Sequence, residues 1–436
     1  MAVVGIALGA VAVLALLVYV HRYVWRRFVG DTTAAGSPLR RAGTVAAYTL
    51  PLLSVGALVS GRSGAPFWLQ QVLAWPGYLW LAALLYLTLA LLVGEAVRPL
   101  LRRLLARRAA AGTPAAPTQT QAQAHAETQA MATTTPQAAA PAPAPASVST
   151  PAPTPAPAPA ADPSRRLFVA RAVGGAAAVA GLGTTGYGAY GVLRGPRVKR
   201  VTVPLARLPR SAHGFRIAVV SDIHLGPILG RAHTRRIVDT VNRTQPDLIA
   251  VVGDLVDGSV DDLGPAAEPL AGLRSRHGAF FVTGNHEYYS GAAQWVDHVR
   301  ELGLHPLENA RVEIGGFDLA GVNDIGGESE GHGPDFGRAL GDRDRTRAAV
   351  LMAHQPVVID EAVEHGVDLQ LSGHTHGGQL WPGNYIAELS NPTVAGLERY
   401  GDTQLYVTRG AGAWGPPVRV GAPSDITVVE LASRQA

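Results

Sequence analysis

The sequence contains no cysteine among its 436 residues, which excludes disulfide bonds, thiolate metal sites and a cysteine nucleophile. Acidic residues are scarce in the first part of the chain. Residues 1–200 hold 18 Lys or Arg and 4 Asp or Glu, whereas residues 201–436 hold 19 Arg and 29 Asp or Glu. The net charge of +4 therefore combines a basic, apolar part with an acidic part of globular composition. A basic part can indicate nucleic-acid binding, but here the arginines flank hydrophobic runs, as in membrane proteins.

Hydrophobic runs recur four times in the basic part, at residues 3–20, 44–60, 75–93 and 172–193. The first and third are long and apolar enough to cross or nearly cross a bilayer. The second and the Ala/Gly-rich fourth fit a membrane span or a buried core helix. The sequence predicts a transmembrane region of three helices over residues 1–109, followed by a fourth membrane segment within 164–200.

The arginines predict how these segments are oriented. Five arginines follow the first segment, five follow the third, and Arg62 alone lies between the second and third. By the positive-inside rule, residues 21–43 and 94–110 are cytoplasmic and the N-terminus is outside. An interfacial aromatic belt is expected at Trp68, Trp75, Tyr78 and Trp80.

Residues 110–163 are rich in Ala, Pro, Thr and Gln and predict a disordered linker. The fourth segment opens with Ser164, Arg165 and Arg166, which resembles a twin-arginine export signal, although Arg171 interrupts its apolar stretch. A plain basic-flanked anchor is the alternative. If the segment spans, the protein is a multi-pass cell-membrane protein with residues 201–436 on the extracytoplasmic side.

The acidic part contains five short apolar runs that each end in residues able to bind metals. They are RIAVV before Asp222 and His224, LIAVV before Asp254 and Asp257, AFFVT before Asn285, His286 and Glu287, AVLMA before His354, and DLQLS before His374 and His376. Such runs are typical of strands buried on both faces of a sheet. Because ligand sites form beyond the carboxyl ends of strands, we expect these side chains to share one rim.

The residue types indicate the chemistry of that rim. Oxygen and imidazole ligands suit Mn, Fe or Zn. Two divalent ions close together can clamp a phosphoryl group and activate a water as hydroxide. Such a pair needs a bridging carboxylate, for which Asp254 is the natural candidate. Each motif alone is weak evidence for a metal site, but five motifs in this order at strand ends are specific evidence for one.

Residues 215–431 resemble the calcineurin-like metallophosphoesterase superfamily, whose pattern is D-x-H, GD-x-x-D, GNH-D/E, H and GH-x-H. The stretches GNHEYY, AHQP, SGHTHGGQ and GAWGPPVRVGAP are similar, more narrowly, to bacterial membrane-anchored YkuE/YaeI-type phosphoesterases. The resemblance implies an α/β fold over residues 201–436: a four-layer metallophosphoesterase sandwich, with two mixed sheets between helices.

The resemblance also implies roles. One metal would be held by Asp222, His224 and His376, and the second by Asn285, His354 and His374, with Asp254 bridging. His286 would act near the substrate as a catalytic group, and Glu287 would orient it through its ring N–H. Asp257 belongs to the motif and is expected behind the ligands, although a turn cap is an equal alternative.

Residues outside the motifs give weaker predictions. In the loop 410–421, Trp414 and Arg419 are substrate-binding candidates, with Arg419 meeting a phosphate; a purely structural loop is the alternative. Gln379 and Asn391 are further pocket candidates. Residues 322–348 are expected to be a flexible insertion. Seven histidines outside the motifs are expected at the surface, namely His213, His233, His277, His298, His305, His332 and His365.

The sequence thus predicts a membrane-anchored phosphoesterase with two divalent metal ions that hydrolyses a phosphomonoester or phosphodiester. Its attachment to the bilayer makes an envelope or lipid-linked substrate a hypothesis. Nucleic acid is not expected as a partner, because the catalytic part is acidic. The oligomeric state is left open. The alternatives are a non-catalytic membrane sensor or scaffold with a structural metal site, and a cytoplasmic enzyme if the fourth segment does not cross.

Overall fold

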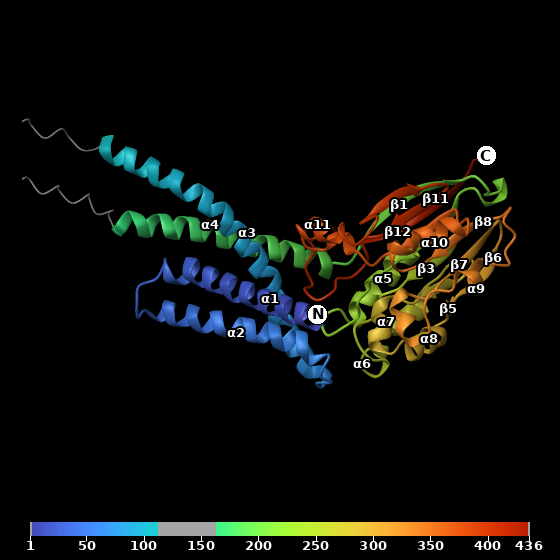
Figure 1. Cartoon of the computed structure of the whole chain (residues 1–436), viewed down its shortest axis with the longest axis horizontal. Coiled ribbons are helices and arrows are strands. Elements are labelled where there is room, and N and C mark those ends of the chain that lie inside the picture. The colour runs from blue at the N-terminus through green and yellow to red at the C-terminus, as the bar shows by residue number, and fades with distance from the viewer. Residues whose placement is uncertain (1, 112–162, 435–436) are drawn as a thin grey trace, which may run out of the picture.

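The computed structural model describes residues 2–111 and 163–434. An elongated bundle of helices occupies one end of the molecule and an α/β domain the other (Figure 1). The predicted linker, residues 110–163, lies outside the described residues except at its two ends, so its disorder stays a prediction.

The bundle consists of four long helices and a short π-helical segment. They are α1 (Ala2–Trp25), η1 (Arg26–Gly30), α2 (Pro38–Ser60), α3 (Phe67–Ala111) and α4 (Pro163–Leu193). Among the described residues, three helical segments are long and apolar enough to cross a membrane: Pro38–Ser60, Phe67–Arg108 and Arg165–Leu193. The first predicted segment lies on α1, where the side chains of residues 2–8 and 10 lie outside the described set.

The helices alternate in direction. The start of α1, the α2–α3 turn and the end of α4 lie at the end of the bundle that faces the α/β domain (Figure 1). The α1–α2 connection and the start of α4 lie at the far end. There Arg27 of η1 pairs with Asp31 and with Glu95 of α3, each at 2.9 Å, and so ties η1 to α3.

The α/β domain contains two six-stranded sheets. The first has the order β1–β12–β2–β3–β4–β5, in which β2 to β5 are parallel and β12 runs antiparallel to β2. Its strands are β1 (Arg197–Leu205), β2 (Phe215–Val220), β3 (Leu248–Val252), β4 (Ala279–Val282), β5 (Leu304–Pro306) and β12 (Asp425–Ser433). Because β1 pairs with β12 from Arg197 onward, the domain includes residues 197–200, which the sequence placed with the membrane segment.

The second sheet has the order β10–β11–β9–β8–β7–β6. Its strands are β6 (Ala310–Ile314), β7 (Phe317–Gly321), β8 (Ala348–Met352), β9 (Leu369–Ser372), β10 (Gly396–Tyr400) and β11 (Thr403–Val407). The four inner strands are parallel, and the edge strands β6 and β10 are antiparallel to their neighbours.

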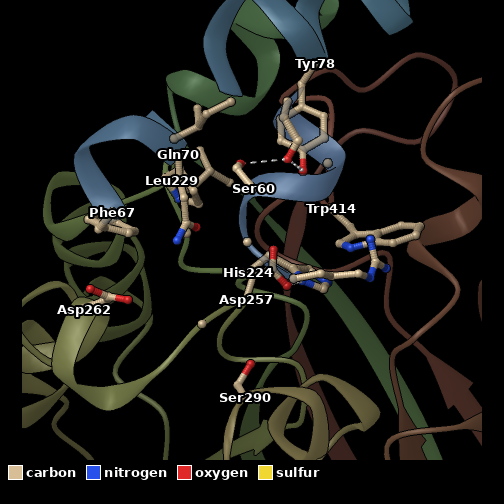
Figure 2. Close-up of a pocket in the computed structure, with 18 of the residues that line it drawn as sticks. Ser60, Phe67, Gln70, Tyr78, His224, Leu229, Asp257, Asp262, Ser290 and Trp414 are labelled. Atoms are coloured by element: carbon tan, nitrogen blue, oxygen red, sulfur yellow. Dashed lines mark hydrogen bonds and ion pairs between the residues drawn. The ribbon is translucent and has the colours of Figure 1, made fainter. Parts of the chain in front are cut away.

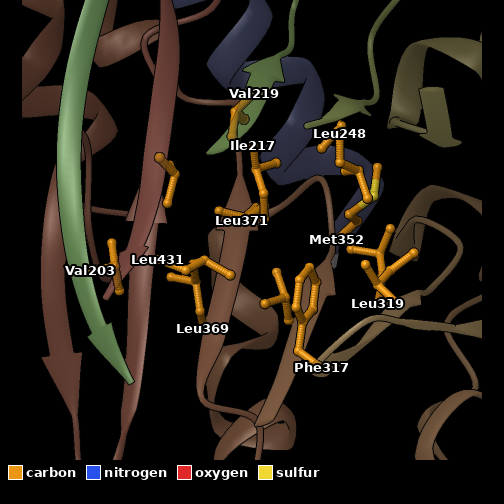
Figure 3. Close-up of a cluster of buried hydrophobic side chains, with 14 of the residues drawn as sticks. Val203, Ile217, Val219, Leu248, Phe317, Leu319, Met352, Leu369, Leu371 and Leu431 are labelled. Atoms are coloured by element: carbon orange, nitrogen blue, oxygen red, sulfur yellow. The ribbon is translucent and has the colours of Figure 1, made fainter. Parts of the chain in front are cut away.

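The two sheets pack face to face. Apolar side chains from both fill the space between them, including Ile217, Leu248, Phe317, Leu369 and Leu431 (Figure 3). The outer face of the first sheet is covered by α5 (Arg231–Arg243), α6 (Val260–Ala267) and α8 (Ala292–Glu301), and that of the second by α9 (Phe336–Leu340) and α10 (Ile359–Glu364). The predicted four-layer sandwich is confirmed. Burial on both faces explains why the strand sequences are continuously apolar.

Shorter elements complete the domain. They are α7 (Asn285–Ser290), α11 (Gly383–Ala387), and the 3-10 turns η2 (Arg210–Ala212), η3 (Glu268–Gly272), η4 (Ile325–Glu330), η5 (Pro356–Val358) and η6 (His376–Gly378). The expected flexible insertion, residues 322–348, instead holds η4 and α9, and Phe336 and Leu340 are buried under the second sheet. His233 is also buried rather than at the surface, because its helix faces the first sheet.

The helical bundle is docked on the α/β domain. The hydroxyl of Tyr86 in α3 donates to the carbonyl of Trp381 at 3.1 Å. Gly188 of α4 lies so close to the 418–420 loop that a Cβ there would come within 2.7 Å of Val418 and 2.8 Å of the Arg419 carbonyl. A larger residue at 188 would push α4 away from this loop.

Candidate metal centre

Seven potential ligands lie where strands from both sheets end. The first sheet contributes Asp222 and His224 after β2, Asp254 after β3 and Asn285 after β4; the second contributes His354 after β8 and His374 and His376 after β9. The sequence predicts one rim beyond five strands. The structure places this rim across the junction of two sheets, which is why chain segments about 150 residues apart meet there.

The backbone at this edge is unusual. Among the described residues, eight other than glycine have positive φ, and five of these are Asp222, His224, Asp254, His374 and His376. A positive φ costs a residue with a Cβ about 1–3 kcal/mol, and such residues cluster at functional sites. The fold therefore holds these side chains against the local preference of their backbone.

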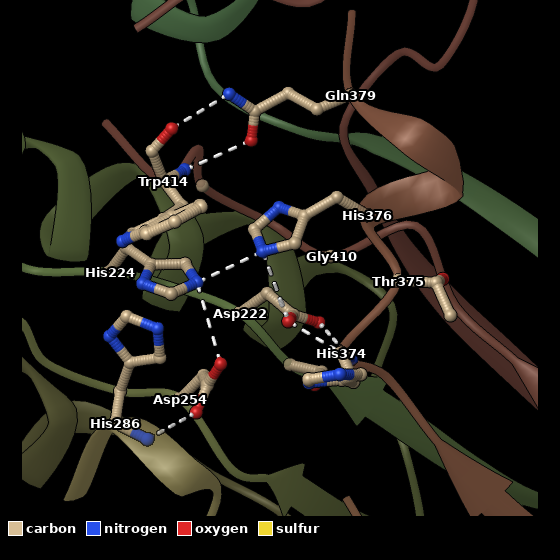
Figure 4. Close-up of polar contacts among 12 residues, drawn as sticks. Asp222, His224, Asp254, His286, His374, Thr375, His376, Gln379, Gly410 and Trp414 are labelled. Atoms are coloured by element: carbon tan, nitrogen blue, oxygen red, sulfur yellow. Dashed lines mark hydrogen bonds and ion pairs between the residues drawn. The ribbon is translucent and has the colours of Figure 1, made fainter. Parts of the chain in front are cut away.

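Asp222, His224 and His376 form the first group of ligand atoms. His376 Nε2 lies 3.3 Å from Asp222 Oδ1 and 3.0 Å from His224 Nε2 (Figure 4). All three side chains are buried. Their ligand atoms lie within 4.8 Å of one another, close enough to share one ion.

Asp254, His354 and His374 form the second group, and Asn285 joins it. His374 Nδ1 is 3.1 Å from Asn285 Oδ1, and His354 Nε2 is 3.2 Å from Asp254 Oδ2. The same Asp254 oxygen lies 3.7 Å from His224 Nε2. Asp254 is thus the carboxylate that stands between the two groups, as a bridging ligand must.

The contacts of the two ring nitrogens of His354 show whether these residues fit a cation. Its Nδ1 lies 2.9 Å from the Val252 carbonyl, which can only accept, so Nδ1 carries a proton. In the neutral ring Nε2 is then a bare lone pair, buried, without a hydrogen-bond partner and facing a carboxylate oxygen. Two facing lone pairs in a buried site require a proton or a metal ion between them. The donor set of imidazoles, carboxylates and an amide suits a first-row divalent ion.

The charges of the site favour bound cations. Burial by itself would raise the pKa of Asp254, but the neighbouring His354 and His224 hold it well below its usual value. Burial would likewise lower the pKa of His224, yet the Asp257 carboxylate raises it to about 9. Burial lowers the pKa of His374 to about 4, so this ring is neutral and offers its lone pair.

Metal affinity is expected to rise with pH. A metal must displace the proton of His224, whose pKa lies near 9 instead of 6.5. The apparent Mn²⁺ affinity of the full-length protein should therefore increase as the pH rises toward about 9. Calorimetry in buffers of different ionisation enthalpy measures both the affinity and the protons released.

The matched variant for this titration is Asp257→Asn. Without the carboxylate that raises the pKa of His224, the increase in affinity should move to lower pH. A metal affinity that does not change with pH in the wild type would contradict the assignment of His224 as a ligand.

His286 is oriented by a different residue than the sequence predicts. Its Nδ1 lies 2.7 Å from Asp257 Oδ1, and the same oxygen lies 2.8 Å from His224 Nδ1. The two imidazoles hold the pKa of Asp257 at about 2 despite its burial, so the carboxylate stays ionised and keeps both Nδ1 atoms protonated. Nε2 is then the nitrogen of each ring that faces away from Asp257.

Glu287, the predicted partner of His286, lies elsewhere. It is fully buried and accepts backbone N–H groups of Asp254, Leu255 and Gly284 at 3.0, 2.8 and 2.6 Å. The carboxylate thus holds the loop that carries Asp254. Burial and the nearby Asp254 raise the pKa of Glu287 to about 7. The prediction was wrong because Glu287 is the third residue of α7. A side chain at this position can turn back and accept a hydrogen bond from the backbone at the start of its own helix.

Of the two substrate-binding candidates, Trp414 lies at the mouth of the site and Arg419 does not. The Trp414 ring is half exposed, its centroid is 5.7 Å from that of His286, and Gln379 holds its backbone from both sides (Figure 4). Arg419 is 4% exposed and donates to the carbonyls of Gly412 and His376. Arg419 supports the loop of His376 from behind, so its predicted phosphate contact is corrected.

Tyr289 is a site residue that sequence reasoning missed. Its ring is 76% exposed and its centroid lies 5.5 Å from that of His286. Both residues lie on α7, and positions three apart share one face of a helix. That spacing within GNHEYY is the signal that could have identified it.

The part of the chain that holds these residues is similar in sequence to known proteins. The sequence model of the family described as calcineurin-like phosphoesterase matches residues 215–378. An uncharacterized metallophosphoesterase of Aquifex aeolicus is 35% identical over 240 residues, which cover 54% of this chain and 91% of that protein. The uncharacterized metallophosphoesterase YkuE of Bacillus subtilis is 29% identical over 284 residues, covering 62% of this chain and 98% of YkuE.

Eukaryotic relatives combine such a domain with membrane segments. A protein of Danio rerio, described as a transmembrane protein with metallophosphoesterase domain, is 38% identical over 259 residues, covering 56% of this chain. The match spans 59% of the length of that protein.

Proposed function

Because the chain belongs to the calcineurin-like metallophosphoesterase family, we propose that it is a metal-dependent phosphoesterase that hydrolyses phosphomonoesters or phosphodiesters. The convergence of seven potential ligands and His286 on one edge of the domain carries the proposal. Two divalent ions, Mn, Fe or Zn, would be held by the two ligand groups, with Asp254 between them.

The residues of the site have separable tasks in such a reaction. Bound divalent ions supply Lewis acidity and lower the pKa of a water molecule. Asp257 fixes the ring of His286 so that Nε2 points away from the carboxylate and can exchange a proton with an ester oxygen. Trp414 and Tyr289 flank His286 and limit the access of water to it.

We propose that several membrane segments anchor the protein and that its catalytic domain lies on the extracytoplasmic side. The α1–α2 connection and the arginines at residues 98–108 lie at the end of the bundle far from the domain (Figure 1). Arginines concentrate on the cytoplasmic side of membrane proteins, which supports placing the domain on the opposite side.

The purified full-length protein in detergent should release phosphate or alcohol from aryl phosphomonoesters or phosphodiesters when Mn²⁺ is added, and chelation should stop the reaction. Intact cells that carry the protein should hydrolyse the same ester without permeabilisation if the domain is outside. Activity only after permeabilisation would favour the cytoplasmic alternative. Metal binding without hydrolysis of any ester would favour the scaffold.

A further inference from the structure

A cavity of about 660 Å³ joins the metal centre to the turn between α2 and α3 (Figure 2). His224, Asp257 and His286 form one wall of this cavity. The opposite wall belongs to the membrane helices and consists of Ala57, Leu58, Ser60, Gly61, Arg62, Gly64, Ala65, Phe67, Gln70 and Tyr78. The active site is thus enclosed partly by the end of a membrane hairpin.

This hairpin wall, residues 57–78, is held in place by packing. Phe67 lies against the apolar cluster under the first sheet. Tyr78 donates to the Ala57 carbonyl at 3.3 Å, and its ring faces Gly415, where an added Cβ would lie 3.7 Å away. The wall is therefore part of the folded site and not a loop that happens to lie nearby.

An apolar surface leads along the helices to the cavity. Leu52, Val55 and Leu58 are all exposed on α2, and their spacing places them on one stripe that ends at the cavity wall. On α3, Trp68 and Trp75 are exposed beside the turn. Tryptophan is typical of the membrane–water interface, so the cavity opens near the level of the lipid headgroups.

The polar groups of the hairpin wall suit an anionic headgroup. Arg62 lies in the turn and is exposed, with its guanidinium donating to the Leu58 carbonyl at 3.2 Å. Among the described residues that line the cavity, Arg62 is the one with a permanent positive charge. A guanidinium at the mouth attracts phosphate and offers it several donors.

We infer that the substrate is an amphiphilic phosphate ester, in which the phosphate is joined to a long hydrocarbon chain. Its chain lies along the exposed apolar stripe of α2, and its phosphate passes Arg62 to reach the metal centre between Trp414 and Tyr289. This inference rests on the proposed phosphoesterase function and adds the class of substrate. Every buried methylene of the chain favours binding, which a short water-soluble ester cannot match.

The test compares matched substrates on the full-length protein in nanodiscs with Mn²⁺. Each pair has the same phosphate chemistry: a water-soluble and a long-chain phosphomonoester, and a water-soluble and a long-chain phosphodiester. The wild type should show a kcat/KM at least about tenfold higher for the long-chain member of one pair. A wild type that hydrolyses only the soluble esters overturns the inference but leaves the proposed function standing, and a wild type inactive on all four overturns both.

Two variants locate the effect on the hairpin. Leu58→Asn should lower kcat/KM for the long-chain ester at least about fivefold more than it lowers kcat/KM for the soluble ester. Leu39→Asn, which replaces an exposed leucine at the far end of α2, is the control and should change neither. An equal loss for both substrates in Leu58→Asn, or no loss for either, contradicts the inference.

A binding measurement independent of turnover uses a long-chain phosphonate with a photoreactive group in its chain. Mass spectrometry of the labelled protein should find the label on residues 52–78, and Arg62→Ala should reduce the labelling at least about threefold relative to Arg41→Ala, an exposed arginine at the far end of the bundle. Labelling that spreads evenly over all four helices, as for any membrane probe, would argue against a chain-binding surface.

Discussion

Asp254→Asn is expected to abolish hydrolysis and to weaken metal binding at both ligand groups. Asp254 is the buried carboxylate shared by the two groups, and one of its oxygens lies within 3.7 Å of both His224 and His354. Asparagine keeps the shape but removes the negative charge that balances two cations. We expect kcat/KM to fall at least about 10³-fold, equivalent to about 4 kcal/mol of transition-state stabilisation.

Two measurements separate this effect from misfolding. Metal content by atomic absorption should fall in Asp254→Asn, while the circular dichroism spectrum at low temperature should not change. Asp239→Asn replaces an exposed carboxylate of α5 and should leave both metal content and activity as in the wild type. Full activity in Asp254→Asn would mean that the two ligand groups do not act together.

His286→Ala should lower kcat by about 10²- to 10⁴-fold while metal binding is retained. A ring nitrogen of His286 lies within 4.8 Å of ligand atoms of His224 and Asp254, the ring makes a T-shaped contact with His224, and Asp257 fixes it toward the cavity. Removing the ring therefore removes a proton donor or acceptor but keeps the ligands. Steady-state kinetics and Mn²⁺ titration of the same preparation measure the two quantities.

His332→Ala, at an exposed histidine away from the cavity, is the control for this substitution. The positioning role of Asp257 gives a second check, because Asp257→Asn should change the pH profile of kcat as well as its size, whereas a purely structural change would alter only the size. Unchanged turnover in His286→Ala, with metal still bound, would favour the scaffold alternative.

The sequence alone identified the strands and the polar residues that gather at their ends. Each of the five apolar runs became the expected strand, since a strand buried on both faces must be apolar throughout, and this pattern is readable without the fold. The order of polar residues after these strands was equally readable. Spacing along the chain therefore predicted which residues gather at the rim.

The sequence did not determine which side chains contact each other within the site. Asp257, not Glu287, orients His286, and Arg419 lies behind His376 instead of at the substrate. Local sequence does not say which way a buried polar side chain turns. The choice depends on which backbone groups are left without partners, and these are known only once the loops are packed.

Only the tertiary structure decided that the turn between α2 and α3 forms a wall of the cavity at the metal centre. Leu58, Arg62 and Phe67 lie more than 150 residues before the first ligand, in a segment that the sequence explains fully as a membrane anchor. The periodicity of apolar residues indicates that a residue is buried in lipid or protein, but it does not indicate against which distant segment the residue packs. The residues of the rim follow from the sequence pattern, whereas the wall that faces them follows from how the helical bundle docks on the α/β domain.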